Sequence, residues 1–206
     1  MPKTLPPFFA AVLLLAVIAM PVRAAENLRI ATFAGGCFWC VEADFDKVLG
    51  VVRTISGFTG GTLANPTYRQ TSAGGTGHRE AVQIYFDPEK VSYAALLEIF
   101  WRSVDPTDKG GQFCDRGESY GTAIFTHSPE QRRLATASKR TLQESRALPI
   151  VTPIENLGRF FPAEEYHQNF YKKSPVRYNF YRFNCGRNAR VKALWGKDAY
   201  RGIPAH

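Results

Sequence analysis

The alternation of apolar and polar residues predicts where the strands lie. Over residues 80–86 the two kinds alternate, with Val82, Ile84 and Phe86 on one face, which is typical of a strand buried on one side. Glu80 shares the parity of these three residues, so its carboxyl is expected to point toward the apolar face. Further apolar runs predict four more strands, over 28–33, 51–58, 121–126 and 151–155.

Helical spacing of apolar residues marks segments between these strands. The clearest is 92–104, whose apolar positions form one face. A second helix is expected over 128–146, because Ser128-Pro129-Glu130-Gln131 is a capping box with proline at the first helical position. A helix over about 37–49 and a short helix over 163–171 complete the set.

Strands and helices therefore interleave, which predicts a single α+β domain with a mixed sheet and packed helices. The last segment, 172–206, is expected to be a loop-rich tail with one helical turn near 189–195. Two long polar loops, 62–79 and 105–119, interrupt the domain. Long loops in compact domains are usually functional, so these two are the first places to look for a site.

The first 24 residues predict a secretory signal. Lys3 precedes an apolar run of thirteen residues, 8–20, and Val22-Arg23-Ala24 places small or modest side chains around a cleavage point. A bilayer requires about 20 apolar residues, so the run is short for an anchor, although an uncleaved anchor is the alternative. Residues 25–206 would then be the mature protein, periplasmic or secreted.

Composition agrees with a folded protein, since 45% of the 206 residues are hydrophobic and 21% are charged. The net charge is +8, and nine of the basic residues lie in the tail beside one acid, Asp198. Basic and aromatic residues interleave there, which can indicate nucleic-acid binding. An exported protein seldom meets nucleic acid, so a solvated basic face opposite an acidic partner is favoured and no nucleic-acid partner is expected.

The placement of the cysteines points to redox chemistry. Cys37 follows a strand and two glycines and opens a helix, where unpaired N–H groups and the helix dipole favour a thiolate. Cys37 and Cys40 have the spacing of a thioredoxin-type redox pair. Cys114 and Cys185 stand apart from them. Structural disulfides among the four cysteines, or a buried apolar Cys37, are the alternatives.

Polar residues suited to proton transfer come from one strand and the two loops. Glu80, if desolvated, should have a raised pKa and donate a proton near neutral pH, whereas a solvated strand-end position is the alternative. Tyr68 lies in the first loop, and Asp115 and Tyr120 lie in the second. Tyrosine hydroxyls can donate to a developing oxyanion, and the Asp115 carboxylate can orient them or a water.

Neighbouring residues limit other interpretations. Phe38 and Trp39 follow Cys37 and could form a slot for a small alkyl group or belong to the core. Val41 rather than His follows Cys40, which argues against haem attachment, and no second close cysteine pair completes a zinc site. No metal or organic cofactor is therefore expected. A thiol–disulfide oxidoreductase using Cys37 and Cys40, a Cys/His hydrolase and a non-enzymatic basic binding module stay open as alternatives.

Beyond these patterns, five segments resemble the A-type peptide-methionine sulfoxide reductases. They are GGCFW over 35–39, NPTYRQTSAGGTGHREAV over 65–82, DPT over 105–107, DRGESYGTAIF over 115–125 and FFPAEEYHQNFY over 160–171. Their order and number, over about residues 29–171, make the resemblance specific. It implies a ferredoxin-like α+β fold and cofactor-free reduction of methionine S-sulfoxide, free or in proteins, to methionine.

The resemblance also implies a role for each candidate residue. Cys37 would be the nucleophile that becomes a sulfenic acid, and Glu80 would protonate the sulfoxide oxygen. Phe38 and Trp39 would shape the pocket for the substrate methyl group. Three polar residues would hold the oxygen or a water beside it: Tyr68, Asp115 and Tyr120. A second cysteine would then close a disulfide that a thioredoxin-like reductant opens, which implies protein repair after oxidative damage.

Three cysteines depart from the commonest family pattern and leave the recycling route open. Cys40 stands where the family often has Gly, Cys114 precedes Asp115 where Asn is frequent, and the tail holds a single cysteine, Cys185. Because Cys185 belongs to a basic, loop-rich tail, it is expected to move toward Cys37 and resolve the sulfenic acid. Cys40 and then Cys114 are the alternatives for this role.

Overall fold

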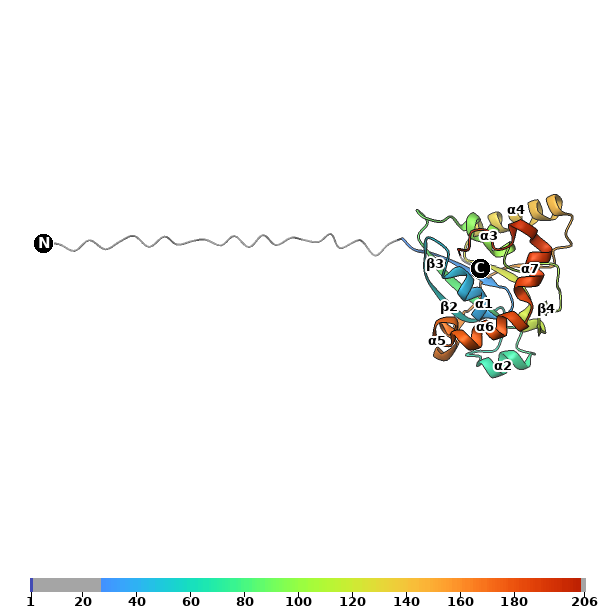
Figure 1. The fold of residues 1–206 in the computed structure, drawn as a ribbon, viewed down its shortest axis with the longest axis horizontal. Coiled ribbons are helices and arrows are strands. Elements are labelled where there is room, and N and C mark those ends of the chain that lie inside the picture. Colours follow the sequence, from blue (N-terminus) through green and yellow to red (C-terminus); the bar gives the residue numbers. More distant parts are fainter. Residues whose placement is uncertain (2–26, 205–206) are drawn as a thin grey trace.

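A six-stranded mixed sheet runs through the part of the chain that the computed structural model describes, Met1 and residues 27–204 (Figure 1). The strand order is β7-β6-β1-β3-β2-β8, and all neighbours are antiparallel except the parallel pair β6 and β7. The bounds are β1 Arg29–Ala34, β2 Val51–Thr59, β3 Arg79–Phe86, β6 Ala123–Thr126, β7 Ile154–Asn156 and β8 Phe161–Pro162. The mixed α+β fold expected from the sequence is confirmed, and the expected leader, 1–24, lies outside the described residues except for Met1.

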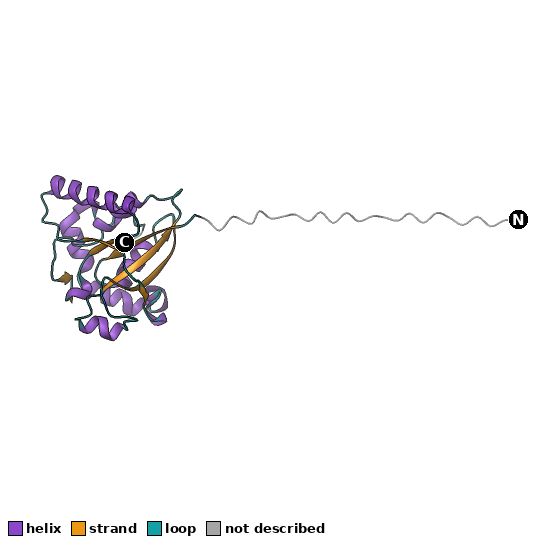
Figure 2. Ribbon diagram, turned by 180° about the vertical axis from the view of Figure 1, so that it is seen from behind, coloured by secondary structure: helices purple, strands orange, loops and turns teal. Residues whose placement is uncertain are grey.

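Helices surround this sheet, and Figure 2 shows the strands at the centre of the domain with helices on their outer sides. The α-helices are α1 Phe38–Phe45, α2 Tyr68–Ala73, α3 Tyr93–Trp101, α4 Pro129–Arg146, α5 Phe170–Lys173, α6 Pro175–Asn184 and α7 Arg187–Trp195. Short 3-10 turns lie at η1 Glu118–Tyr120, η2 Glu165–His167 and η3 Gly196–Asp198, and β4 Gly111–Gln112 pairs with β5 Asp115–Arg116. Among the described residues, no helix combines the length and the apolar character needed to span a bilayer.

The main core lies between one face of the sheet and the helices α1, α3 and α4. The predicted parity of β3 is confirmed, since Val82, Ile84 and Phe86 are all buried in this core. Phe33 of β1 stacks on Phe100 of α3 with ring centroids 4.9 Å apart, which joins the sheet to the helical layer. Burial of these large side chains fixes the register of β3 and therefore the direction in which Glu80 points.

Helix boundaries follow local capping. Ser128 caps α4 as expected, and Ser92 caps α3 in the same way, each accepting a backbone N–H three residues ahead. The Gln131 carboxamide accepts the N–H of His127 at 3.0 Å rather than that of Ser128, so only half of the expected capping box forms. The single helix expected over 163–171 is wrong: Gln168 and Asn169 separate η2 from α5, and the φ of Asn169, 53°, lies in the left-handed region that asparagine tolerates.

The loop-rich tail is also wrong, because 170–195 forms three successive α-helices, although the helical turn expected near 189–195 does lie in α7. Proline begins α6, and Gly186, with φ 73°, turns the chain into α7. The spacing of apolar residues did not predict α6, because in this helix apolar side chains are exposed and a charged side chain is buried. Arg182 is buried while the rings of Phe180 and Phe183 are exposed, so the apolar residues do not mark the buried face.

Candidate active site

Cys37 lies at the start of α1, where the sequence predicted it. It is the residue before the first helical residue, and its carbonyl accepts the backbone N–H of Cys40 at 3.1 Å. The chain reaches this position through Gly36, whose φ is +79°. A Cβ on Gly36 would lie 2.6 Å from the Cβ of Gln112, so only glycine fits this turn. The Cys37 side chain is 7% exposed, at the edge of the buried interior.

Cys37 and Cys40 form a hydrogen-bonded pair of buried thiols with different acidities. Burial raises the pKa of Cys37 well above the usual thiol value, and Cys40 and the charge of Glu80 raise it further. The hydrogen bond from Cys37 lowers the pKa of Cys40 to about 7, and nearby guanidinium charges act in the same direction. Cys40 is therefore the more acidic thiol of the pair. Burial thus opposes the thiolate that the helix start was expected to favour at Cys37.

The cations that favour a Cys40 thiolate come from the tail. Arg182 of α6 donates to the Asp44 carboxylate at 2.8 Å, and both side chains are buried. Arg187 of α7 is 1% exposed and donates to the carbonyls of Gly35 and Ser103, each at 2.9 Å. Two guanidinium groups of the basic tail are therefore buried next to α1. The solvated basic face that was expected from composition consists only of the outer residues of the tail.

Glu80 reaches the same helix end from β3. Its carboxylate accepts the backbone N–H of Phe38, the first residue of α1, at 2.9 Å, and its side chain is 2% exposed. Burial raises the pKa of Glu80 to about 8, with smaller upward contributions from the charges of Asp115 and Cys40. The hydrogen bond from Phe38 opposes this rise. A carboxyl with this pKa is largely protonated at neutral pH and can act as an acid.

Three polar side chains from the two long loops surround Glu80. Tyr68 begins α2, Asp115 lies in β5 and Tyr120 ends η1. Burial and then the charge of Glu80 raise the pKa of Tyr68 to about 12, although a hydrogen bond with Tyr120 opposes the rise. Burial also raises the pKa of Tyr120 and of Asp115. Both phenols therefore keep their protons and can donate to an oxygen.

Two aromatic residues after Cys37 occupy different environments. Phe38 is 1% exposed and packs between Phe58 and Tyr68, so its ring belongs largely to the core. Trp39 is only partly buried and stacks on Phe170, with ring centroids 3.8 Å apart. Its indole N–H donates to Nδ1 of His167 at 3.0 Å. Trp39 is thus held rigidly as one wall beside the nucleophile.

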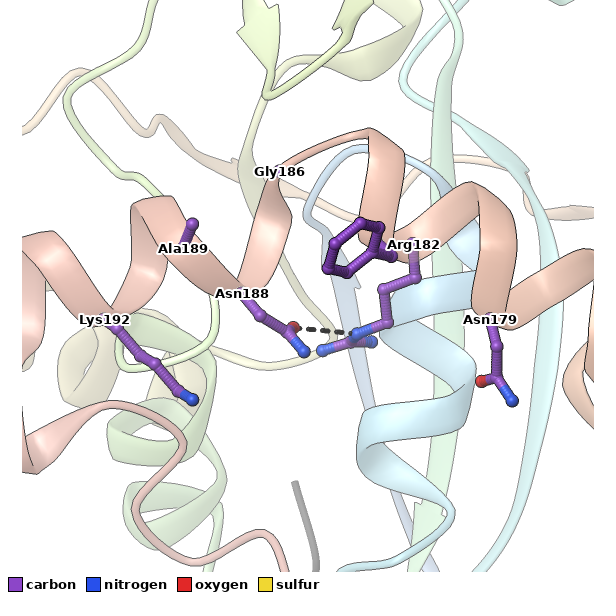
Figure 3. A pocket seen from close by; sticks show the side chains of 7 residues that line it. Asn179, Arg182, Gly186, Asn188, Ala189 and Lys192 are labelled. Atoms are coloured by element: carbon purple, nitrogen blue, oxygen red, sulfur yellow. Dashed lines mark hydrogen bonds between the residues drawn. The ribbon is translucent and has the colours of Figure 1, made fainter.

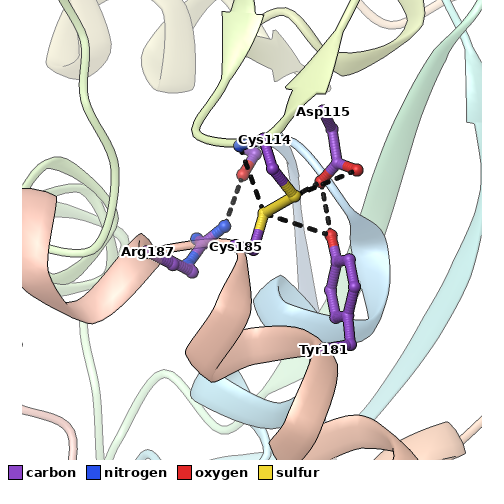
Figure 4. Close-up of a disulfide and its surroundings, with 6 residues drawn as sticks. Cys114, Asp115, Tyr181, Cys185 and Arg187 are labelled. Atoms are coloured by element: carbon purple, nitrogen blue, oxygen red, sulfur yellow. Dashed lines mark hydrogen bonds between the residues drawn. A yellow bond between two sulfur atoms is a disulfide. The ribbon is translucent and has the colours of Figure 1, made fainter.

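Cys185 is not a free thiol in a mobile loop, contrary to the expectation from the sequence. It follows the last residue of α6 and is bonded to Cys114, which lies in the exposed turn between β4 and β5 (Figure 4). The Cys185 sulfur lies 3.8 Å from an oxygen of Asp115 and 3.9 Å from the Tyr181 hydroxyl. That hydroxyl donates to Asp115 and also hydrogen-bonds Cys37. The disulfide therefore borders the site through one phenol.

Sequence reasoning missed three residues of this site: His167, Phe170 and Tyr181. All three come from the segment after β8 and reach Cys37 only through the tertiary fold. Burial lowers the pKa of His167 to about 4, so its imidazole is neutral and accepts from Trp39. Two of the three residues stand in the 160–171 segment that supported the family resemblance, which was the available signal. Tyr181 had no such signal.

One group of potential metal ligands touches this site. Oxygen and sulfur atoms of Cys114, Asp115 and Cys185 lie within 4.8 Å of one another. Because the two sulfurs are joined in a disulfide, neither is a thiolate, and one carboxylate alone does not hold a metal ion.

Comparisons with known proteins agree on one family. The family model described as peptide methionine sulfoxide reductase matches residues 29–199. Peptide methionine sulfoxide reductase MsrA 2 of Rhizobium meliloti is 53% identical over 186 residues, which cover 90% of this chain and 92% of that protein. The reduced form of Mxr1 from Saccharomyces cerevisiae superposes with a TM-score of 0.69 at 29% identity, over 72% of this chain and 87% of that chain. Methionine sulfoxide reductase A of Corynebacterium diphtheriae gives a TM-score of 0.67 at 32% identity, over 75% and 79%.

Proposed function

The chain belongs to the peptide methionine sulfoxide reductase family and reduces methionine sulfoxide to methionine. We propose that it acts on the S epimer and that Cys37 and Glu80 carry out this chemistry. The observation that carries the proposal is the position of the Glu80 carboxyl. The carboxyl accepts the backbone N–H of Phe38, the residue after Cys37, and its pKa is raised to about 8. A protonated carboxyl therefore lies close to the nucleophile.

The first step is attack of the Cys37 sulfur on the sulfoxide sulfur. Cys37 gives its proton to Cys40, to which it is already hydrogen-bonded, and so becomes nucleophilic as the substrate arrives. Glu80 transfers its proton to the sulfoxide oxygen, which makes that oxygen able to leave the substrate sulfur. Methionine departs with the electron pair, and Cys37 retains the oxygen as a sulfenic acid.

The oxygen is stabilised during this step by the polar residues around Glu80. The phenols of Tyr68 and Tyr120 keep their protons and donate to the developing charge. Asp115, held by the Tyr181 hydroxyl, orients the oxygen or a water beside it. The partly exposed face of Trp39 supports the substrate methyl group. Phe38 packs against His167, the residue that accepts the Trp39 indole N–H.

We assign the resolving step to Cys40 rather than to Cys185. Cys40 hydrogen-bonds the Cys37 sulfur and has a pKa lowered to about 7, so it is a ready nucleophile for the sulfenic acid. Attack forms a Cys37–Cys40 disulfide and releases water. Cys185 is bonded to Cys114 and is not a thiol when the sulfenic acid forms. Cys185 instead acts later, when reducing equivalents return.

A thioredoxin-like dithiol is proposed to restore the enzyme, and repair of oxidised proteins is the proposed cellular role. We also propose that the chain is exported to the periplasm or secreted after cleavage near Ala24. The support is the apolar run over 8–20 and the cleavage residues that follow it. An oxidising compartment would make delivery of electrons to the disulfides a requirement of every cycle.

The experiment is reduction of a peptide containing methionine S-sulfoxide, with dithiothreitol as reductant and methionine measured by chromatography. Stoichiometric methionine from the S epimer, and little from the R epimer as matched control, is the expected result. Insulin reduction with the same reductant tests the alternative of a thiol–disulfide oxidoreductase. Rapid insulin reduction without methionine formation would replace the proposed function by that alternative.

A further inference from the structure

Helix α6 exposes an apolar stripe that the fold does not cover. Val176, Phe180 and Phe183 are 83%, 71% and 84% exposed, and their spacing of four and three residues places them on one helix face. Tyr178 and Arg182 lie on the opposite face and are buried. The two phenylalanine rings therefore point away from the domain, and contiguous exposed apolar surface usually marks an interaction site.

Cations border the stripe on both sides. On the side of α5, Arg177 lies three residues before Phe180, a spacing that makes the two side chains neighbours on the helix surface. The Arg177 guanidinium is also 5.8 Å from the centre of the Phe170 ring, which belongs to α5. Arg177 is exposed, and no carboxylate of the described residues pairs with it. It therefore presents an unneutralised charge at one border of the stripe.

The other border lies on α7. A pocket of about 470 Å³ separates the two helices and is lined by Phe183 and Asn179 of α6 and by Lys192 of α7. Figure 3 shows Lys192 and Asn179 at opposite ends of this pocket, with Arg182 between them. Lys192 is exposed, and within the described part of the chain it has no acidic partner either. The apolar stripe thus continues into a pocket that has a cation at its edge.

The surface around the stripe is positive because the three tail helices contain no acid. Between Glu165 and Asp198 the sequence has no acidic residue, and α5, α6 and α7 all lie in this stretch. Three carboxylates from other elements pair with cations of these helices: Asp44, Asp46 and Asp105. Each of these three side chains is at most 11% exposed, so they leave the outer charge in place.

We propose that this face of α6 and α7 binds the surface of a lipid bilayer that contains anionic phospholipids. Phe180 and Phe183 enter the interface, and Arg177 and Lys192 lie beside lipid phosphates. An apolar helix face flanked by cations is the arrangement with which amphipathic helices lie in a membrane interface. Long basic side chains suit this position, because their carbon chains contact apolar groups while their charges stay at the headgroups. The proposal does not depend on the proposed function.

A bilayer fits this face better than a protein partner does. A twofold interface between two copies through α6 would bring two positive surfaces together. The stripe is also small, since three side chains on one convex helix cover less than the about 800 Å² per partner that a stable protein interface buries. A bilayer needs no matched groove, and its anionic headgroups attract the flanking cations while the rings insert.

Co-sedimentation with vesicles tests this surface. The parent should bind vesicles of equal parts phosphatidylglycerol and phosphatidylcholine more tightly than vesicles of phosphatidylcholine alone. Phe180→Ser should lower the partition coefficient on the anionic vesicles about tenfold, because it removes inserted apolar area. Lys192→Gln should lower it about fivefold, because it removes one cation from a charged surface. Every variant keeps the same N-terminus as the parent, so any contribution of the apolar run over 8–20 is common to all.

Two matched controls lie outside the tail helices. Leu49→Ser removes an 81% exposed leucine, and Lys109→Gln removes an exposed cation. Both should bind anionic vesicles as the parent does. Methionine formation driven by dithiothreitol should be the same in all four variants, so failure of the proposed function would be seen separately from failure to bind lipid.

Fluorescence quenching tests insertion of the stripe. Brominated phosphatidylcholine, added to the anionic vesicles, quenches a tryptophan that reaches the acyl chains. Phe180→Trp should lose a larger fraction of its fluorescence than the parent does, whereas Leu49→Trp should lose no more than the parent. Equal quenching of the parent and Phe180→Trp would show that the stripe stays outside the bilayer and would overturn the proposal.

Other results would also overturn the proposal. Equal binding of anionic vesicles by the parent, Phe180→Ser and Lys192→Gln would show that this face does not bind lipid. No binding of vesicles, together with binding of polyglutamate that Lys192→Gln weakens, would assign the face to an acidic protein. A parent dimer that Phe180→Ser dissociates, seen by light scattering, would assign the stripe to a second copy of the chain.

Discussion

The Glu80 carboxyl accepts the backbone N–H of Phe38, so the proton donor is fixed to the helix end that carries Cys37. Strand β3 and helix α1 meet at this bond. Because both partners are buried, the bond holds the carboxyl in place while burial keeps it protonated. One hydrogen bond thus couples the position of the acid to the position of the nucleophile.

Glu80→Gln should slow formation of methionine in a single turnover by roughly 10²–10⁴-fold, the usual contribution of a general acid. Glutamine keeps the shape and can still accept the Phe38 N–H, but it has no proton to give. Quenched-flow measurement of methionine over the first turnover checks this. Glu42→Gln is the matched control, because it changes another buried carboxyl, which lies within α1. Its single-turnover rate should stay within a few-fold of the parent.

The pH profile separates proton donation from a structural effect. The parent's single-turnover rate should fall as pH rises through about 8, where Glu80 loses its proton, and as pH falls through about 7, where Cys40 gains one. The alkaline fall due to Glu80 should disappear in Glu80→Gln. The same fall at the same pH in both proteins would remove Glu80 from the acid's role.

Buried Glu42 should make stability depend on pH. Burial raises its pKa to about 7, above the ordinary value of 4.5, although the Asn169 N–H donates to it at 2.8 Å. A raised folded-state pKa means that its contribution to stability is complete below the unfolded pKa and is lost as pH rises through about 7. Urea unfolding should therefore show a smaller loss of stability with rising pH in Glu42→Gln than in the parent.

The exposed Glu89→Gln is the matched control for that measurement and should keep the parent's pH dependence. Identical slopes for Glu42→Gln and the parent would show that Glu42 does not change its proton affinity on folding.

The order of the cysteines can be read from disulfide maps. Parent protein given one equivalent of sulfoxide should contain a Cys37–Cys40 bond, with Cys114–Cys185 unchanged. Cys40→Ser should instead keep a sulfenic acid on Cys37 that dimedone labels. Cys185→Ser should complete the first turnover and stop cycling with thioredoxin. A Cys37–Cys185 bond in the parent's map would return the resolving role to Cys185.

Export predicts a processed N-terminus. Mass spectrometry of the protein made in its native host should find Ala25 first, or Glu26 if cleavage moves by one residue, because Val22-Arg23-Ala24 precedes that bond. The material should come from the periplasm or the medium. Intact Met1 on cytoplasmic protein would contradict the prediction.

Sequence patterns predicted correctly those features of the fold and the site that a single segment determines. The alternation over β3 placed Glu80 on the buried face, and the glycines before Cys37 marked the start of α1. They failed for features that depend on contacts between segments far apart in the sequence. Arg182 is buried because Asp44 of α1 binds it, and no local pattern shows that pairing. The tail was therefore predicted to be mostly loop.

The same limit applies to the thiol chemistry. Helix position alone favoured a Cys37 thiolate, but burial and the neighbouring Cys40 reverse the order of acidities. The pairing of Cys114 with Cys185 joins residues 71 positions apart and depends on where α6 ends. Spacing along the chain leaves such a pairing open.

The most direct test of the account is single-turnover reduction of methionine S-sulfoxide by Cys37→Ser beside Cys40→Ser. Both substitutions remove one buried thiol of the same pair, so each is the matched control for the other. The account predicts no methionine from Cys37→Ser and one equivalent, formed more slowly than by the parent, from Cys40→Ser. Methionine from Cys37→Ser, or its absence from Cys40→Ser alone, would contradict the assignment of Cys37 as the nucleophile.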